Sequence, residues 1–216
     1  TLEYEIVDFP SEKMQGKYSI KDSLLKVETE QKEIRIEFYT YFNTELSPDN
    51  YASRDIFIWR FGWYPQIIDY DNPNALTPHK WKIIPNHPEN WVYAGGGEYN
   101  SIGQYYYSNG KYASNPLIFL NRKTYKSYSI KGEEVDTTIW FKEGLNHKAS
   151  SILTYSQKAL KMHIEKFGDL RYSNINIIHS PYPAMMGMAA DRVFILSDSF
   201  FTTADLVLPG LIDPIT

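Results

Sequence analysis

The chain has 216 residues, of which 43% are hydrophobic, and this is enough to bury the core of one large domain or of one domain and part of another. Its formal net charge is −4 and it has no run of basic residues, so its charge predicts no binding to nucleic acid or to an anionic membrane surface. No apolar stretch approaches the roughly 20 residues of a membrane-spanning helix, and the absence of Cys excludes disulfides and thiolate chemistry but leaves the cellular compartment open.

The first two thirds of the chain have the pattern of β-strands. Aromatic residues make up 16% of the sequence, and large rings favour strands because they fit a pleated surface. From Ile34 to Phe42 apolar and polar residues alternate, which predicts a strand with one face in a core. From Asp55 to Arg60 the central positions are all apolar, which predicts a strand that is covered on both sides.

Several further short strands are predicted between turn signals such as the Ser-Asn-Gly-Lys sequence at residues 108–111. They run from Trp81 to Ile84, Trp91 to Ala94, Tyr105 to Tyr107, Leu117 to Leu120, Tyr125 to Ile130 and Val135 to Phe141. The tract from Gly95 to Tyr112 is rich in Gly, Tyr, Ser and Asn, and its composition indicates a hairpin and loop. Many short strands with frequent turns predict a β-sandwich or a large curved sheet.

After Gly144 the pattern changes to that of a helix followed by strands. Residues 147–167 contain neither Pro nor Gly, and four large apolar residues fall on one helical face, with Gly168 as the stop signal. These four are Leu153, Leu160, Ile164 and Phe167. Asn174 to Ile178 and Arg192 to Leu196 are predicted as strands of one sheet. The fold class is therefore α+β, mainly β, with a β-rich domain over residues 1–145 and the start of a second domain over residues 146–216.

The order of motifs in the second part resembles the aminopeptidase N-like zinc metallopeptidases of the gluzincin clan. In that family, a helix ending in Phe-Gly is followed by a Tyr and then by an apolar strand, and here Phe167-Gly168, Tyr172 and Ile175 to Ile178 have the same order and spacing. In the first part, Gly62-Trp63-Tyr64-Pro65 resembles an element of the family's amino-terminal β-domain, and Trp91 to Glu98 resembles the strand and Gly-containing turn that follow it. The resemblance implies a β-sandwich or curved-sheet domain followed by the opening helix and strands of a thermolysin-like catalytic domain.

The resemblance also implies a substrate-binding strand. Family members carry a G-x-M-E-N strand, whose backbone pairs with a peptide and whose Glu binds the free α-amino group. Aligned on its Met, this element falls on Met186-Gly187-Met188-Ala189-Ala190, so Met188 is kept while Met186 replaces the Gly and Ala189 replaces the Glu. We therefore expect Met186, Gly187, Met188 and Ala189 to bind peptide substrate, without a counter-charge for an amino terminus. Simple packing of the Met residues beside Phe194 is the alternative.

Zinc is expected only in a longer parent protein. The sequence contains no H-E-x-x-H, in which two His one turn apart bind zinc together, and its five His have no metal-ligand spacing, which predicts surface or structural roles. Asp191, Asp198 and Asp205 are likewise predicted as solvated carboxylates. The first residues lack Met and a signal-peptide pattern, which indicates a start inside a longer protein. This chain alone is thus expected to supply no catalytic residue, to bind no zinc and to hydrolyse no peptide.

Two functional interpretations follow from the sequence. In the first, the chain is a non-catalytic fragment of a zinc-dependent peptidase and contributes the amino-terminal β-domain and part of the substrate cleft. In the second, the chain is an aromatic-rich β-sandwich recognition module whose Trp and Tyr side chains bind glycan or protein.

Overall fold

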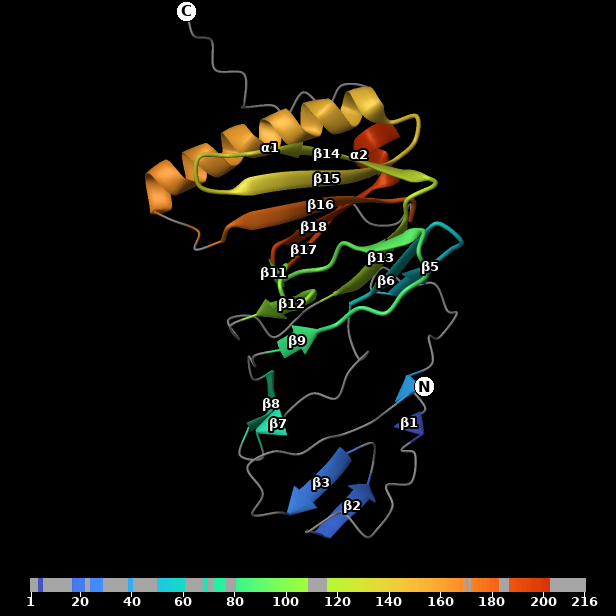
Figure 1. The fold of residues 1–216 in the computed structure, drawn as a ribbon. Helices are drawn as coiled ribbons and strands as arrows, with labels where there is room; N and C mark the ends of the chain where they lie inside the picture. The colour runs from blue at the N-terminus through green and yellow to red at the C-terminus, as the bar shows by residue number, and fades with distance from the viewer. Residues whose placement is uncertain are drawn as a thin grey trace, which may run out of the picture.

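Two helices and eighteen strands make up the described part of the chain (Figure 1). The computed structural model describes residues 4–5, 17–21, 24–28, 39–40, 50–60, 68–69, 72–76, 81–108, 116–168, 170, 172–182 and 187–202. The strands are β1 (Tyr4–Glu5), β2 (Lys17–Lys21), β3 (Leu24–Glu28), β4 (Tyr39–Thr40), β5 (Asn50–Ala52), β6 (Ile56–Trp59), β7 (Ile68–Asp69), β8 (Asn72–Leu76), β9 (Trp81–Ile83), β10 (Trp91–Tyr93), β11 (Glu98–Asn100), β12 (Tyr105–Ser108), β13 (Leu117–Asn121), β14 (Tyr125–Ile130), β15 (Asp136–Lys142), β16 (Asn174–Ser180), β17 (Gly187–Ala190) and β18 (Val193–Ser197). The helices are α1 (Asn146–Phe167) and α2 (Asp198–Thr202). The fold class is α+β, mainly β, as the sequence predicts.

The largest sheet has five strands in the order β14-β15-β16-β18-β17. Its three central strands are parallel, and its two edge strands pair antiparallel with their neighbours. The parallel pair β15 and β16 is joined through α1, because parallel neighbours need a long crossover connection. The two strands predicted after the helix, now β16 and β18, lie side by side in this sheet, which confirms that prediction.

Helix α1 covers one face of this sheet over β14 and β15 (Figure 1). Ala149 and Leu153 are buried, and Leu160 and Ile164 pack against the same core, as the helical spacing predicts. Gly168 ends the helix with φ +85°, in the left-handed region that favours glycine, and its amide donates to the Ile164 carbonyl over 2.8 Å. In the described residues, no helix is long and apolar enough to cross a membrane.

Phe167 shares the predicted helical face with Leu153, Leu160 and Ile164 but is not buried with them. The side chain is 69% exposed, and its ring lies 4.9 Å from that of His163. Length gives the reason: 22 helical residues extend about 33 Å, whereas the seven residues of β15 extend about 23 Å. The last turn of the helix therefore projects past the strand that it covers.

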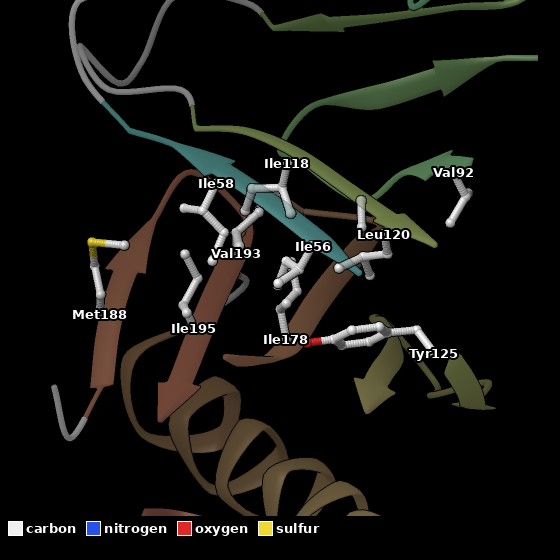
Figure 2. Close-up of a cluster of buried hydrophobic side chains, with 11 residues drawn as sticks. Ile56, Ile58, Val92, Ile118, Leu120, Tyr125, Ile178, Met188, Val193 and Ile195 are labelled. Carbon is white, nitrogen blue, oxygen red and sulfur yellow. The ribbon is translucent and has the colours of Figure 1, made fainter. Parts of the chain in front are cut away.

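A four-stranded sheet in the order β10-β13-β6-β5 packs on the other face of the five-stranded sheet. Figure 2 shows the core between the two sheets, in which side chains of β6 and β13 meet those of β16 and β18. From the four-stranded sheet come Ile56, Ile58, Val92, Ala94, Ile118 and Leu120, and from the five-stranded sheet come Tyr125, Ile178, Met188, Val193 and Ile195. Because side chains alternate along a strand, neighbours of these residues face α1 and form a second core on that side.

The Gly- and Tyr-rich tract forms a hairpin, as predicted. Within it β11 pairs with β12, and β12 pairs with β9, in a three-stranded sheet. Just before this hairpin, the backbone of Gly95 lies close to that of Pro116. A Cβ built on Gly95 would lie 2.6 Å from the Pro116 carbonyl oxygen, so a larger residue would not fit without a shift.

The predicted strands that fall in described segments are all present, with bounds shifted by at most a few residues. The strand predicted from Ile34 to Phe42 lies outside the described residues except for β4, and the Trp63-Tyr64-Pro65 element lies wholly outside them. The division into domains at residue 145 remains a prediction. Strands from both sides of that position, β15 and β16, are neighbours in one sheet.

Truncating the core between the two sheets should destabilise the protein strongly. Ile178 is fully buried there, and Ile178→Ala is expected to lower the free energy of unfolding by about 2–5 kcal/mol, because it leaves a cavity as well as losing apolar burial. Ile102→Ala is the matched control, since that side chain is 97% exposed and its loss should change the value by less than about 0.5 kcal/mol. Denaturant unfolding monitored by circular dichroism measures both, and equal effects would contradict the assigned core.

Candidate functional site

The strand predicted to bind substrate forms one edge of the five-stranded sheet. β17 spans Gly187–Ala190 and is the last strand in the sheet order, and within the described part of the chain it pairs only with β18, antiparallel. Three of the four residues predicted to bind substrate, Gly187, Met188 and Ala189, therefore share this edge strand. The fourth, Met186, lies outside the described residues.

The connection between β17 and β18 determines which backbone groups of β17 are open. Ala190 pairs with Val193, so only two residues form the turn, and the pair that closes such a turn is hydrogen-bonded. Hydrogen-bonded and non-hydrogen-bonded pairs alternate along an antiparallel ladder, so Met188 also bonds to β18. The amide and carbonyl groups of Gly187 and Ala189 consequently point away from the sheet.

The side chains of β17 alternate between the core and the surface. Met188 is buried in the core between the two sheets, whereas Gly187 and Ala189 are exposed on the opposite face. On that face Phe194 is the cross-strand partner of Ala189 and is 41% exposed. Met188 and Phe194 therefore lie on different faces, and the open part of the edge carries only a hydrogen atom and a methyl group.

The turn after β17 is anchored by a charged side chain. Arg192 has φ +58° and is buried, and its Nη2 donates to Glu98 Oε1 over 2.6 Å. Its Nη1 donates to Asn174 Oδ1 over 3.3 Å, and its guanidinium lies 5.0 Å from the centre of the Tyr172 ring. Asp191 is 3.7 Å away, measured from its Oδ1 to Arg192 Nε. The hairpin is thus tied to β16 and to the separate three-stranded sheet.

Glu98 on β11 is the acceptor that completes this anchor. Tyr107 donates its hydroxyl to Glu98 Oε2 over 2.7 Å, so both carboxylate oxygens have a donor. The hydrogen bonds from Tyr107 and Arg192, together with the positive charge of Arg192, hold the pKa of Glu98 below its ordinary value of 4.5, against the opposing effect of burial. Glu98 is therefore an ionised partner of Arg192 near neutral pH.

A second polar contact joins the same two parts of the structure. Asn176 on β16 donates through Nδ2 to the Gly95 carbonyl over 3.4 Å and accepts a hydrogen bond from Trp140 Nε1 at 3.3 Å. Tyr93 donates its hydroxyl to the Gly96 carbonyl over 3.2 Å, which fixes the Gly-rich segment from the other side. The segment that leads into Glu98 is therefore held by hydrogen bonds that do not involve the ion pair.

The buried His179 contacts the partly exposed Asp198 at the carboxyl ends of β16 and β18. The His179 side chain is 1% exposed, and its Nε2 lies 3.0 Å from Asp198 Oδ1. A carboxylate only accepts, so Nε2 carries the proton, and Nδ1 has no hydrogen-bond partner among the described atoms. Burial lowers the pKa of His179 below 6.5, and the hydrogen bond to Asp198 opposes this shift only in part.

The other His and Asp predictions have mixed outcomes. His179 is structural, as predicted, and His147 and His163 are at the surface, whereas His79 and Asp205 lie outside the described residues. The prediction that Asp191 is a solvated carboxylate is wrong, because the residue is 3% exposed and faces Arg192. Within the described segments, no three His, Asp or Glu side chains come together as a metal site.

Glu98 and Arg192 carry no sequence pattern that predicts their contact. In the sequence, Arg192 is only the first residue of a predicted strand, and Glu98 only ends a Gly-containing turn. The two residues are 94 positions apart, and the contact between them has no local signal.

Comparison with known proteins gives a likeness at the level of the fold. No family model matches the chain, and no curated protein matches it. Among solved structures 83 chains match, and one is the crystal structure of an aminopeptidase N family protein from Idiomarina loihiensis, with a TM-score of 0.50 and 10% sequence identity. The alignment covers 74% of this chain and 28% of that chain. At this identity the likeness concerns the fold alone, and it agrees with the resemblance noted in the sequence.

The buried His179 should make the stability of the protein depend on pH. Its pKa is lowered on folding, so its contribution is complete above about 6.5 and is lost as the pH falls, because the unfolded chain takes up the proton first. His179→Gln keeps an amide donor for Asp198 but cannot be protonated. We expect the wild type to lose more stability than this variant between pH 7 and pH 5, by at most about 1.4 kcal/mol per pH unit.

Denaturant unfolding at each pH measures this difference, and His163→Gln is the control for replacing a histidine that is exposed to water. Parallel pH profiles of the wild type and His179→Gln would contradict the role of His179.

Proposed function

We propose that this chain is the non-catalytic, peptide-binding part of a zinc-dependent peptidase, in which β17 pairs with an extended peptide substrate. The observation that carries the proposal is the open edge of β17, where Gly187 and Ala189 offer backbone groups that β18 does not use. The fold likeness to an aminopeptidase N family protein supports the same assignment. The alignment covers only 28% of that neighbour. We therefore propose peptidase activity for a longer parent protein and not for this chain by itself.

Strand addition would bind a peptide through its main chain, largely independently of its sequence. A peptide placed beside β17 gains main-chain hydrogen bonds to Gly187 and Ala189, which do not depend on its side chains. The small side chains at these positions let the peptide backbone approach closely. Met188 keeps the strand in place from the core side, because it is buried between the two sheets.

The charge distribution at this edge favours internal or blocked peptide segments. Ala189 stands where the family has the Glu that binds an amino terminus. The two carboxylates that contact the turn, Asp191 and Glu98, both face the Arg192 guanidinium, which offsets one of their two negative charges, and both are committed to that contact. We therefore propose that β17 binds an internal segment of a peptide and not its free amino terminus.

The described residues do not fit a zinc site. Such a site needs three or four ligands held together, and no such cluster occurs among them. We therefore propose that the metal and the groups that activate water are supplied by a part of the parent protein outside these 216 residues. The role of this chain is then to bind and align the substrate.

Alternate N-methylation of a peptide tests strand pairing directly. Alternate amides of a paired peptide face β17. In the parent protein, methylating the set of alternate amides that faces β17 should weaken binding at least tenfold, whereas methylating the other set should have little effect. Fluorescence anisotropy with a labelled, acetylated eight-residue peptide measures the affinity. Equal losses at all positions, or no binding of the unmethylated peptide, would refute pairing to this edge.

Restoring the missing carboxylate should change the preferred substrate. Ala189→Glu is expected to shift preference toward free amino termini by roughly tenfold to a hundredfold, since a charge-assisted hydrogen bond is worth about 1.5–3 kcal/mol. The ratio of affinities for matched free and acetylated peptides is the readout. Ala159→Glu on the exposed face of α1 adds the same charge elsewhere and should leave the ratio unchanged. A parent protein that already requires a free amino terminus would contradict the proposal.

The recognition-module interpretation has one observation in its favour. Tyr99 is 55% exposed and lies 5.0 Å from the ring of Tyr106, which in turn lies 4.4 Å from that of Tyr93. An exposed ring supported by others is typical of surfaces that stack on sugars or side chains. Tyr99→Ala would abolish binding in that case and leave peptide pairing at β17 intact.

A further inference from the structure

We propose that Arg192, held by Glu98, is a positioning residue that fixes the open edge of β17 in its peptide-binding register. The inference rests on the proposed function of β17 and names the part of the fold that keeps this strand ready to bind. Neither residue is assigned a contact with the peptide. Both act through the hairpin that β17 forms with β18.

The backbone at Arg192 requires an anchor. Its φ of +58° lies in the left-handed region, which costs free energy for any residue with a Cβ and persists only where the surroundings hold it. Three side chains from elsewhere in the chain contact the guanidinium, namely Glu98, Asn174 and Tyr172. The Arg192 carbonyl also accepts a hydrogen bond from the Asn176 amide at 2.8 Å, so backbone and side chain are both fixed.

Because the turn is short, the contacts that fix Arg192 also fix the position of β17. Asp191 and Arg192 are the only residues between the paired Ala190 and Val193, so the turn has no spare length. A shift of one residue in pairing would exchange the two faces of β17 and bring Met188 out of the core. It would also turn the open groups of Ala189 toward β18. The conformation of Arg192 therefore selects which backbone groups the edge presents.

The anchor also connects parts of the chain that otherwise belong to different sheets. Glu98 lies on β11 in the three-stranded sheet, whereas Arg192 precedes β18 in the five-stranded sheet. Arginine suits this place because its planar group can donate to Glu98 and Asn174 at once, which a lysine ammonium on a flexible stem does less well. The amino-terminal β-structure thereby sets the geometry of the candidate binding edge.

Variants at the two positions test this role in the full-length parent protein. Arg192→Gly relieves the left-handed backbone but removes the anchor, Arg192→Lys keeps the charge, and Glu98→Gln keeps an acceptor without charge. Arg54→Gly is the control, because that side chain is 92% exposed. Each variant is assayed at least 15 °C below its melting temperature for the affinity of the acetylated peptide and, without peptide, for hydrogen exchange at each amide from 187 to 190.

We expect Arg192→Gly to weaken peptide binding at least tenfold and to speed exchange at the Met188 and Ala190 amides at least tenfold, while the Ile139 and Ile177 amides in the sheet centre stay protected. Arg192→Lys and Glu98→Gln should fall between this variant and the wild type, and they carry the test if Arg192→Gly does not fold. Arg54→Gly should match the wild type. Graded recovery in Arg192→Lys distinguishes positioning from general loss of structure, which would also expose Ile139 and Ile177.

Two results would overturn the inference: wild-type affinity in a folded Arg192→Gly variant, or unchanged exchange at Met188 and Ala190. If the wild type binds no peptide but exchange at these amides rises in the variant, the proposed function fails and the positioning of β17 by Arg192 stands.

Discussion

The packing of two sheets against each other is the constraint on which the rest of the structure depends. Ile56 and Ile118 from one sheet meet Ile178 and Ile195 from the other, and all four are essentially inaccessible to water. Each fully buried aliphatic side chain contributes roughly 1.5–3 kcal/mol, which is far more than a surface ion pair provides. The polar contacts between Glu98, Arg192, Asn176 and Gly95 form beside this core and depend on the alignment that it imposes.

The five-stranded sheet combines two kinds of strand that serve different purposes. Its parallel centre is covered on both faces, by α1 and by the four-stranded sheet, and Ile139 and Ile178 there are fully buried. Among the described residues its antiparallel edge strands have no partner on their outer sides, and at β17 the exposed side chains are small. An exposed sheet edge beside a buried centre is the arrangement to which an extended strand can be added.

Much of the fold follows from local patterns in the sequence. The span of α1 follows from the absence of Pro and Gly and from the stop at Gly168, and the short strands follow from runs of β-branched and aromatic residues between turn signals. The exposure of Phe167 could not be predicted, because helical spacing does not indicate where the covering sheet ends. The burial of Asp191 has no signal in the sequence, because it depends on the contacts that hold the neighbouring Arg192 side chain against distant parts of the chain. The edge position of β17 agrees with the family resemblance, whereas its anchor depends on a contact across 94 residues that one sequence does not reveal.

The two edges of the five-stranded sheet also differ in how they resist self-association. β14 carries Lys126, and a charge on an edge strand discourages pairing with another copy of the chain. β17 has no charged residue among its four, so it lacks this protection. Its short length limits the number of hydrogen bonds that a second copy could form. Of the two edges of this sheet, β17 is therefore the one more open to pairing with a second copy of the chain.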